Sequence, residues 1–457
     1  MENVIQFINS NKENYIEELK EFLRIQSISS DPEKKSEMQR AAEFLMSKFS
    51  DMGFENVKIL NPDEGHPVVY AEKIVDRKKP TVLFYGHYDV QPVDPIELWT
   101  SPPFEPEIRD GKIWARGATD DKGQLYTHLK SVEAFIKTGE ELPVNVKFII
   151  EGEEEVGSPT LPKLLKQNKN LLKSDAVVIS DTSMYDEKTP SITYSLRGLA
   201  YFQIEITGPN RDLHSGTFGG AVMNPIQALC DLLSGMKDKN GRITIPHFYD
   251  DVLPLTKKER DGFKKLKFDE KKYMKELGVK ELFGEKGYTT LERTWARPTL
   301  EINGIWGGYT GVGAKTVLPS KAYAKISMRL VPNQTPQKVE KLLKDYLKKV
   351  VPKSVTYKLE TLHGGEPAIT PIDNEAIQVA AKAMKKAFGK EPVFVREGGS
   401  IPIVVDFGRI LNAPVVLMGF GLSTENLHSP NEHFDLNNFH RGIICSAYFL
   451  NEFSSVK

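Results

Sequence analysis

Polar side chains of metal-binding types follow several apolar segments of this 457-residue sequence. The apolar residues 81–85 run into GHYDVQP, which places His87 and Asp89 two positions apart. In an extended chain both side chains project to the same face, so the imidazole and the carboxylate would lie side by side. A carboxylate that orients a histidine is common around metal ions. By itself, however, a histidine at a strand end is more often a structural hydrogen-bonding group.

Two adjacent aspartates precede the next helical stretch. The string ARGATDDKG places Asp120 and Asp121 directly ahead of the helical periodicity of residues 124–137. A carboxylate in this position can simply cap the helix, by accepting hydrogen bonds from its first backbone N–H groups. N-capping and metal binding are therefore both open interpretations of this pair.

Three adjacent glutamates follow an apolar strand in IIEGEEEVGS. The carboxylates of Glu153, Glu154 and Glu155 repel one another unless a cation neutralises them or one retains a proton. An acidic surface turn is the alternative, but the apolar run before them leads in from a core strand, which favours a cation. Two further candidates follow other apolar segments: VVISDTS ends a strand on Asp181, and ENLHSPNE contains His428.

Together these positions offer two histidines and several carboxylates. Such a set suits Zn²⁺, Mn²⁺ or Co²⁺ rather than cations that prefer thiolates, and it leaves the choice among the three open. A single metal ion would not need so many ligands. Two ions about 3.5 to 4 Å apart, joined by a shared carboxylate, could activate a water molecule and polarise a carbonyl group together.

The elements that would position these residues alternate between helices and buried strands. Apolar spacing predicts helices at 15–25, 41–52 and 124–137, and buried strands at 81–85, 146–150 and 176–179. This alternation predicts an α/β fold with a mostly parallel central sheet flanked by helices. Ligands of open α/β sheets usually bind at the carboxyl ends of the strands, where the polar clusters stand.

The middle of the chain has a different pattern. Alternating strands in AYFQIEITG and AYAKISMRLVP flank a Lys/Glu-rich helical region at 256–285, and a helix at 374–388 then restores the α/β pattern. We therefore predict a discontinuous catalytic, metal-binding domain from residues 1–195 and 366–457. Residues 196–365 would form an inserted α+β lid or dimerisation domain.

Composition limits the partners and the compartment. The 61 basic residues nearly cancel the 62 acidic ones, so no net field would hold a nucleic acid or an anionic membrane. Cys230 and Cys445 form no CxxC pair, which argues against a disulfide framework and a thiolate zinc site. No segment approaches the ~20 apolar residues that span a bilayer, and the amino-terminal residues lack a signal-peptide pattern. We expect a soluble, cytoplasmic protein.

Two other catalytic patterns are excluded. Residues 308–316 read GYTGVGAKT and resemble the phosphate-binding loop GxxxxGK[ST], but Ala314 separates the glycine from the lysine. The residues that follow contain a proline and then strand-like alternation, whereas a phosphate-binding loop opens a helix. The serine-hydrolase elbow GxSxG is absent.

Eight short motifs occur in one order from about residue 80 to 435: GHYDVQP, WARGATDDKG, EGEEEVGS, VISDTS, DLHSGTFGG, SMRLVPN, REGGSIP and NLHSPNE. In this order they resemble the co-catalytic metallopeptidase superfamily of aminoacylase, carboxypeptidase G and carnosinase. The likeness is greatest to the cytosolic non-specific dipeptidases. Each motif alone is weak, whereas eight in register cover most of the chain.

The resemblance implies a role for each candidate ligand. Asp120 would bridge two metal ions, and His87 and Asp181 would complete the first site. Glu155 and His428 would complete the second site.

The resemblance also implies the proton-transfer group. Glu154 would act as the general base, taking a proton from water and returning it to the leaving amine. Asp89 would support His87. In the superfamily the peptide bond after the bridging aspartate is cis, which predicts a cis bond between Asp120 and Asp121.

Residues of the middle segment match substrate-binding positions of the superfamily. His214 would reach the active site of the partner subunit in a homodimer and stabilise the oxyanion, with Thr316 nearby. Arg329 would bind the substrate carboxylate through its planar guanidinium. Further pocket positions match His363, Glu397 and Ser400. Without the resemblance, His214 would be assigned to a glycine-rich loop and Arg329 to the protein surface.

Three functions remain. The first is a dipeptidase that releases the C-terminal amino acid of a small peptide, which the strings DLHSG, SMRLVPN and REGGS favour. An N-acyl amino-acid deacylase or carboxypeptidase needs the same metal ions and differs only in the pocket. The third is a metal-stabilised binding or scaffold protein without turnover, which would have little use for Glu154.

Overall fold

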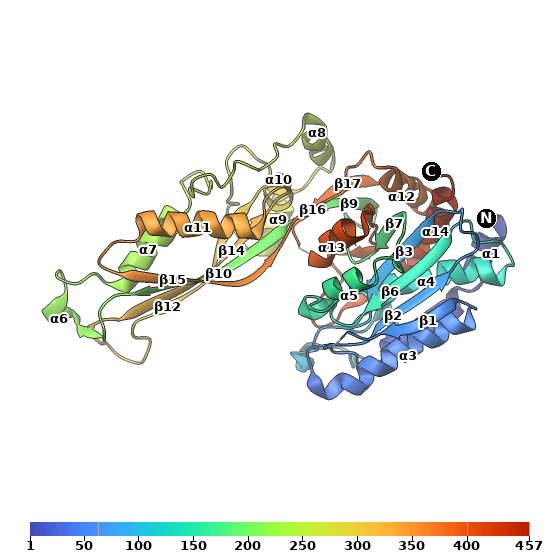
Figure 1. Ribbon diagram of the computed structural model, residues 1–457, viewed down its shortest axis with the longest axis horizontal. Helices are drawn as coiled ribbons and strands as arrows, with labels where there is room; N and C mark the ends of the chain where they lie inside the picture. Colours follow the sequence, from blue (N-terminus) through green and yellow to red (C-terminus); the bar gives the residue numbers. More distant parts are fainter. Residues whose placement is uncertain (63, 400, 457) are drawn as a thin grey trace. The chain divides into compact units, whose positions relative to one another are not determined.

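The computed structural model describes residues 1–62, 64–399 and 401–456, and its chain divides into two compact units. Unit 1 contains Met1–Tyr194, Thr370–Val395 and Ile403–Lys457, and unit 2 contains Ser195–Ile369 and Arg396–Pro402. The colours of Figure 1 follow this path: the blue to green chain before residue 195 belongs to unit 1, the green to orange chain that follows belongs to unit 2, and the orange to red chain after residue 369 returns to unit 1 except at 396–402. The roles of catalytic domain and of lid or dimerisation domain stay predictions.

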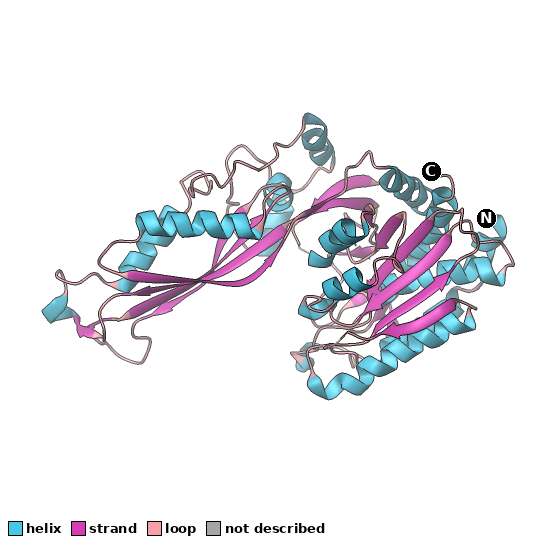
Figure 2. Ribbon diagram, viewed as in Figure 1, coloured by secondary structure: helices cyan, strands magenta, loops and turns pink. Residues whose placement is uncertain are grey.

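Unit 1 is built on a mixed sheet with a parallel centre (Figure 2). In spatial order the strands are β1 (Glu55–Leu60), β2 (Val68–Lys73), β6 (Asn145–Glu151), β3 (Thr81–His87), β7 (Ala176–Ile179), β18 (Val415–Leu417) and β9 (Ser191–Leu196). The four central strands β6, β3, β7 and β18 are parallel, whereas β1, β2 and β9 pair antiparallel. The predicted α/β class with flanking helices is confirmed, and the parallel arrangement is that of the central strands.

The central strands are buried on both faces because aromatic side chains pack on each side of the sheet. On one face the rings of Phe84 and Phe148 stack at 5.0 Å, and Phe49 lies 4.9 Å from Phe148. On the other face Tyr85 meets Phe407 at 5.0 Å. Strands buried in this way read as continuous apolar runs, which is why the sequence pattern found them.

Helices supply these partners. They are α1 (Glu2–Ser10), α2 (Lys12–Leu23), α3 (Lys35–Asp51), α4 (Lys122–Lys137), α5 (Leu161–Gln167), α12 (Glu375–Phe388), α13 (Pro402–Leu411) and α14 (Leu436–Phe453). Phe49 belongs to α3 and Phe407 to α13, so these two helices cover opposite faces of the sheet. Among the described residues, no helix combines the length and apolarity that crossing a membrane requires.

Unit 1 also contains two small sheets of short strands. A three-stranded sheet joins β4 (Glu107–Arg109), β5 (Lys112–Trp114) and β20 (His433–Asp435). The strands β8 (Ser183–Met184) and β19 (Gly421–Leu422) form a parallel pair. Both arrangements join segments that lie far apart in the sequence.

Unit 2 contains a four-stranded antiparallel sheet in the order β12 (Thr299–Gly307), β14 (Lys321–Leu330), β10 (Gly198–Thr207) and β15 (Thr356–Gly365). Alternate residues of β10 and β14 are buried, and the packing helices are α7 (Pro225–Gly235) and α11 (Pro336–Val350). The remaining elements are β11 (Leu213–His214), α6 (Ser215–Phe218), α8 (Lys257–Lys265), α9 (Glu270–Leu277), α10 (Thr290–Trp295), β13 (Val317–Leu318) and β16 (Ala368–Ile369). The predicted helical region at 256–285 is therefore two short helices joined by irregular chain.

Candidate metal centre

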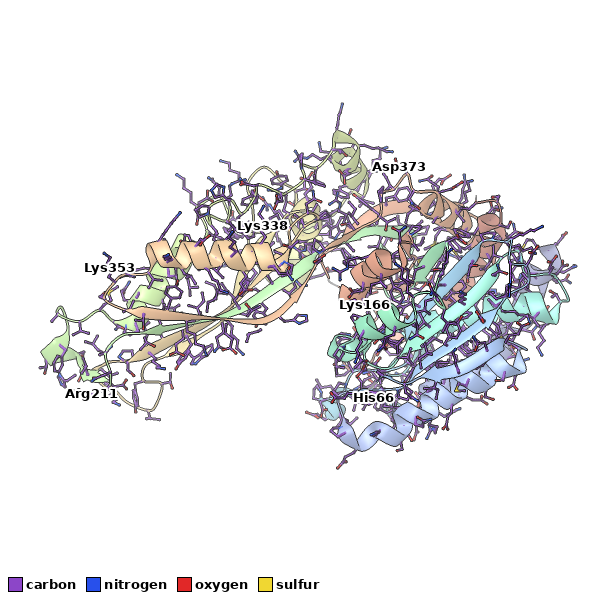
Figure 3. The ribbon with its side chains drawn as sticks, viewed as in Figure 1. His66, Lys166, Arg211, Lys338, Lys353 and Asp373 are labelled. Carbon is purple, nitrogen blue, oxygen red and sulfur yellow. The ribbon has the colours of Figure 1, made fainter. Side chains whose placement is uncertain are left out.

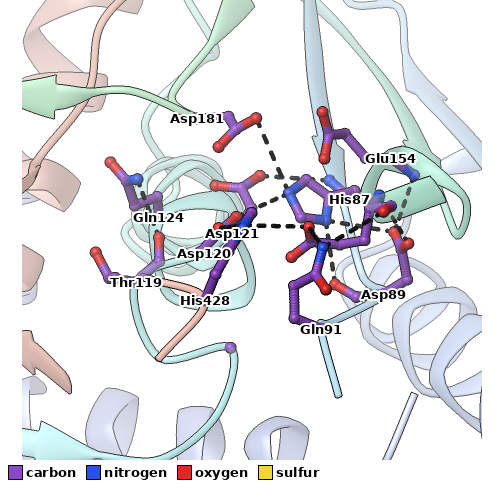
Figure 4. Close-up of polar contacts among 12 residues, drawn as sticks. His87, Asp89, Gln91, Thr119, Asp120, Asp121, Gln124, Glu154, Asp181 and His428 are labelled. Carbon is purple, nitrogen blue, oxygen red and sulfur yellow. Dashed lines mark hydrogen bonds and ion pairs between the residues drawn. The ribbon is translucent and has the colours of Figure 1, made fainter. Parts of the chain in front are cut away.

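Five of the predicted ligands lie together beyond the carboxyl ends of the central strands (Figure 4). His87 is the last residue of β3, and Asp181 follows β7. Asp120 lies in the turn before α4, Glu155 in a 3₁₀ helix after β6, and His428 in the loop after β19. Parallel strands deliver their carboxyl ends to one edge of a sheet, so residues far apart in the sequence meet there.

Asp120 is shared by two groups of potential ligands. Its Oδ1 lies 3.2 Å from Nε2 of His87, and its Oδ2 lies 2.9 Å from Nε2 of His428. In one group the ligand atoms of His87, Asp120 and Asp181 lie within 4.8 Å of one another. In the other group the same holds for Asp120, Glu155 and His428. One carboxylate therefore faces both groups, with a different oxygen toward each.

The cluster carries more negative charge than its two imidazoles can balance. Burial raises the pKa of Glu154 to about 7, and the neighbouring Asp120 adds to the rise while His87 opposes it. Burial also raises the pKa of Asp181 well above its usual range, again with a contribution from Asp120. Burial acts in the same direction on Asp120, but His428 and His87 outweigh it and hold the pKa of Asp120 below its usual range. Cations between these carboxylates would stabilise their ionised forms.

The buried imidazole of His87 presents one nitrogen to the cluster. Its Nδ1 lies 3.1 Å from the carbonyl oxygen of Asp89 and 3.3 Å from Oδ1 of the same residue. Its Nε2 has no hydrogen-bond partner among the described residues, although it faces Asp120 and Asp181. A proton on Nδ1 leaves a lone pair on Nε2, and a lone pair that faces carboxylates is unfavourable unless a cation lies between them. These donors fit a divalent metal ion.

Asp89 connects His87 to the glutamates. Its Oδ1 accepts a hydrogen bond from the N–H of Glu154 at 3.2 Å, and its Oδ2 accepts one from the N–H of Glu155 at 3.1 Å. Gln91 donates to Oε2 of Glu155 at 2.7 Å. The buried Asp89 carboxylate thus fixes the end of β3 against the turn after β6.

The peptide bond between Asp120 and Asp121 is cis, as the resemblance implied. Asp121 occupies the N-cap position of α4, but its side chain makes no capping hydrogen bond. Instead its Oδ2 accepts a hydrogen bond from the N–H of His87 at 3.3 Å. Helix capping by this pair, the alternative left open by the sequence, is therefore wrong.

The predicted substrate-binding residues that the structure describes belong to unit 2, and Ser400 lies outside the described residues. Nε2 of His214 lies 3.4 Å from Oγ1 of Thr316, so the structure brings these two together. Arg329 lies half-buried on β14, and His363 lies on β15 opposite Tyr201 of β10. Glu397 ends β17 (Val393–Glu397), where burial raises its pKa to about 7. That these residues line one substrate pocket stays a prediction.

Sequence reasoning missed Glu432, a buried residue that holds the turn around Asp120. Its Oε1 accepts hydrogen bonds from the N–H groups of Thr119 and Asp120, both at 3.1 Å. Its Oε2 accepts from the N–H of Gly117 at 2.9 Å and from the guanidinium of Arg116 at 2.8 Å. The only sequence signal is that Glu432 ends the motif NLHSPNE, because bonds to a backbone 312 positions away leave no periodicity.

Glu425 and Gln124 complete this support. Oε2 of Glu425 accepts hydrogen bonds from the Thr119 hydroxyl and from the N–H of Leu422, both at 2.8 Å. Oε1 of Gln124 accepts from the backbone N–H groups at 420 and 421. Hydrogen bonds thereby connect the turn that carries Asp120 with the segment that leads into the loop of His428.

Comparison with known proteins gives a consistent result. The model of peptidase family M20/M25/M40 matches residues 83–452. The chain is 35% identical to Cys-Gly metallodipeptidase dug1 of Schizosaccharomyces pombe, over 100% of this chain and 99% of that protein. It is also 35% identical to the Beta-Ala-His dipeptidase of Homo sapiens, over 98% of this chain and 92% of that protein.

Solved structures agree with these matches. The di-peptidase Dug1p from Saccharomyces cerevisiae superposes with a TM-score of 0.81 at 35% identity, covering 100% of this chain and 99% of that one. The M20 family metallo-carboxypeptidase Sso-CP2 from Sulfolobus solfataricus has a TM-score of 0.84 at 35% identity, covering 96% of this chain and 99% of that one.

The contacts of Glu432 generate a prediction. Both carboxylate oxygens of Glu432 accept hydrogen bonds from N–H groups. In Glu432→Gln an NH₂ group, which cannot accept, would replace one of these oxygens, so the turn that carries Asp120 would shift. We expect divalent-cation binding to weaken about 10- to 100-fold, as for other residues that orient ligands. Calorimetric titration of Mn²⁺ into metal-free protein measures this affinity. Glu107→Gln is the matched control because Glu107 is an exposed residue of β4. Unchanged affinity in a folded Glu432→Gln variant would contradict the assigned role.

Proposed function

The chain belongs to peptidase family M20/M25/M40, and from this premise we propose that it is a two-metal dipeptidase that hydrolyses the amide bond of small peptides. The observation that carries the proposal is the position of Asp120, whose two carboxylate oxygens face two different imidazoles. A carboxylate placed in this way suits the bridge of a two-metal hydrolytic site.

Two metal ions would be held by His87, Asp120 and Asp181 on one side and by Asp120, Glu155 and His428 on the other. When bound, they would polarise the substrate carbonyl group and lower the pKa of a water molecule. Imidazole and carboxylate ligands favour Zn²⁺ or Mn²⁺ and also accept Co²⁺.

Glu154 is the proposed general base. The hydrogen bond from its N–H to Asp89 fixes its backbone beside the ligand Glu155. Burial raises the pKa of its carboxyl group to about 7, close to the value that suits a group that both accepts and returns a proton near neutral pH. Glu154 would take a proton from the attacking water and give it to the leaving amine.

Residues of unit 2 would bind the substrate. Arg329 would pair with the substrate carboxylate, and His214 with Thr316 would stabilise the oxyanion in the active site of the partner subunit of a homodimer. Further pocket residues are His363, Glu397 and Ser400. We also propose that the protein is located in the cytoplasm.

The printed names of the relatives support a dipeptide substrate and also define the alternative. Two relatives at 35% identity are named as a Cys-Gly metallodipeptidase and a Beta-Ala-His dipeptidase. A solved structure at the same identity is named as a metallo-carboxypeptidase. Carboxypeptidase or N-acyl amino-acid deacylase activity is therefore the second candidate.

The first test removes and restores the metal. We expect chelation to abolish dipeptide hydrolysis and either Zn²⁺ or Mn²⁺ to restore it, because the buried carboxylates need a cation to position water and substrate. Restored enzyme should hydrolyse dipeptides faster than N-acetyl amino acids and longer peptides, as measured by amino-acid release. Hydrolysis at full rate without divalent ions would contradict the metal centre, and faster hydrolysis of N-acetyl amino acids would favour the alternative.

The second test addresses the base. Glu154→Gln keeps the size of the side chain and removes its ability to accept a proton, so we expect kcat to fall by about 10²- to 10⁴-fold while metal content stays normal. Glu153→Gln is the matched control, since the Glu153 carboxylate accepts from the Thr160 hydroxyl and belongs to neither ligand group. An active Glu154→Gln enzyme would overturn the assignment.

The third test addresses the partner subunit. Neither His214→Ala nor Glu154→Gln homodimers should be active. Randomly mixed subunits should recover about a quarter of wild-type activity, because half of the dimers are mixed and each mixed dimer contains one complete site. Activity after co-refolding measures this, with each variant refolded alone as the control. No recovery in demonstrably mixed dimers would rule out action in the neighbouring subunit.

A further inference from the structure

Unit 2 contains a pocket of about 430 Å³ whose lining is strongly basic. Four residues of this lining lie on one face of β12 and β14, because Thr299 pairs with Arg329 and Glu301 pairs with Ser327. The charged lining residues are the basic Arg197, Lys237, Arg293, Arg297 and Arg329 and the acidic Glu285 and Glu301. The lining therefore has an excess of three positive charges.

The two acidic residues are already engaged. Glu285 pairs with Arg297 through two contacts of 2.7 and 2.9 Å, and it also meets Arg242 at 3.3 Å from outside the lining. Glu301 lies 3.4 Å from Nζ of Lys237. Basic side chains thus outnumber acidic ones among the groups that a ligand bound in this pocket would meet.

Arg293 is held in the lining by uncharged neighbours. Its Nε donates to the carbonyl oxygen of Glu285 at 3.0 Å. Gly284 makes room for its stem, since a Cβ atom there would lie 2.6 Å from Cδ of Arg293. The backbone thus fixes the position of this arginine without removing its charge.

Arg197 and Arg329 are close enough to influence each other. Burial and the nearby Arg329 lower the pKa of Arg197 to about 10. Nε of Arg197 donates to the carbonyl oxygen of Gly398 at 3.2 Å, next to the predicted substrate-binding Glu397. Two cations kept together in a partly buried place favour an anion between or beside them.

We propose that this pocket binds a second carboxylate of the substrate, so that the preferred substrates are dipeptides with an acidic C-terminal residue. The inference rests on the proposed dipeptidase function, in which Arg329 receives the main-chain carboxylate. Arg293 lines the same pocket as Arg329 and offers a second guanidinium, which an acidic side chain of the substrate could meet. A volume of about 430 Å³ lies within the usual range of small-ligand sites, about 300–1,000 Å³, and arginine pairs well with carboxylates.

The test compares substrates of equal shape and different charge. We expect kcat/KM for Ala-Glu to exceed that for Ala-Gln by about tenfold or more, and Ala-Asp to exceed Ala-Asn likewise, because each acid gains a charge-assisted hydrogen bond. Arg293→Gln should lower the Glu/Gln ratio by about tenfold. Lys353→Gln removes the same charge from an exposed position of unit 2 outside the lining (Figure 3) and should leave the ratio unchanged.

Each outcome separates this inference from the function on which it rests. Equal kcat/KM values for acid and amide, or a ratio that Arg293→Gln does not change, would overturn the inference and leave the dipeptidase proposal intact. Absence of any hydrolysis would contradict the proposed function. Calorimetric titration then still tests the pocket, because glutamate should bind more tightly than glutamine and lose this advantage in Arg293→Gln. Inorganic phosphate binding as tightly as glutamate would indicate a general anion site and overturn the assignment.

Discussion

Buried negative charge at the carboxyl ends of the parallel strands is the constraint on which this structure depends. The carboxylates there fall into two classes. Asp89 and Glu432 receive hydrogen bonds from backbone N–H groups, which satisfy them and fix the surrounding turns. Asp120 and Asp181 instead face Nε2 of His87, which has no hydrogen-bond partner among the described residues. The first class is satisfied by backbone groups of the fold, whereas the second faces imidazole nitrogens and other carboxylates, an arrangement that cations would stabilise.

The parts of this arrangement that local chemistry encodes were predictable from the sequence. Strands buried on both faces read as apolar runs, and polar residues directly after them, such as His87 and Asp181, had to meet at one edge of a parallel sheet. Glu432 and Glu425 could not be found in this way, since their partners are backbone groups far along the chain. The helical pattern at 256–285 overstated the helix because charged side chains with helical spacing also tolerate the irregular chain between α8 and α9.

Near-neutral net charge conceals strong local separation of charge. The totals of 61 basic and 62 acidic residues exclude a field over the whole molecule, yet unit 1 gathers carboxylates around Asp120 and unit 2 gathers arginines around Arg329. Composition therefore argues against polyanionic partners while leaving small charged ligands open. Like charges brought together repel one another, and a ligand of opposite sign would relieve that repulsion, which is why we propose a ligand-binding role for both clusters.

We expect substrate specificity to arise in unit 2, because the proposed metal centre would serve several reactions equally well. The proposed bridging aspartate, two imidazoles and glutamate base, with two metal ions bound, would suit a dipeptide, a longer peptide or an N-acyl amino acid alike, since each presents the same amide carbonyl. Relatives named as dipeptidases and as a carboxypeptidase share the same 35% identity with this chain, so overall similarity does not separate them. What distinguishes their substrates is the group on each side of the amide, and only side chains that touch those groups can discriminate. In our proposal the charged lining of the unit 2 pocket supplies such side chains, and its basic residues would favour a substrate that carries more than one carboxylate.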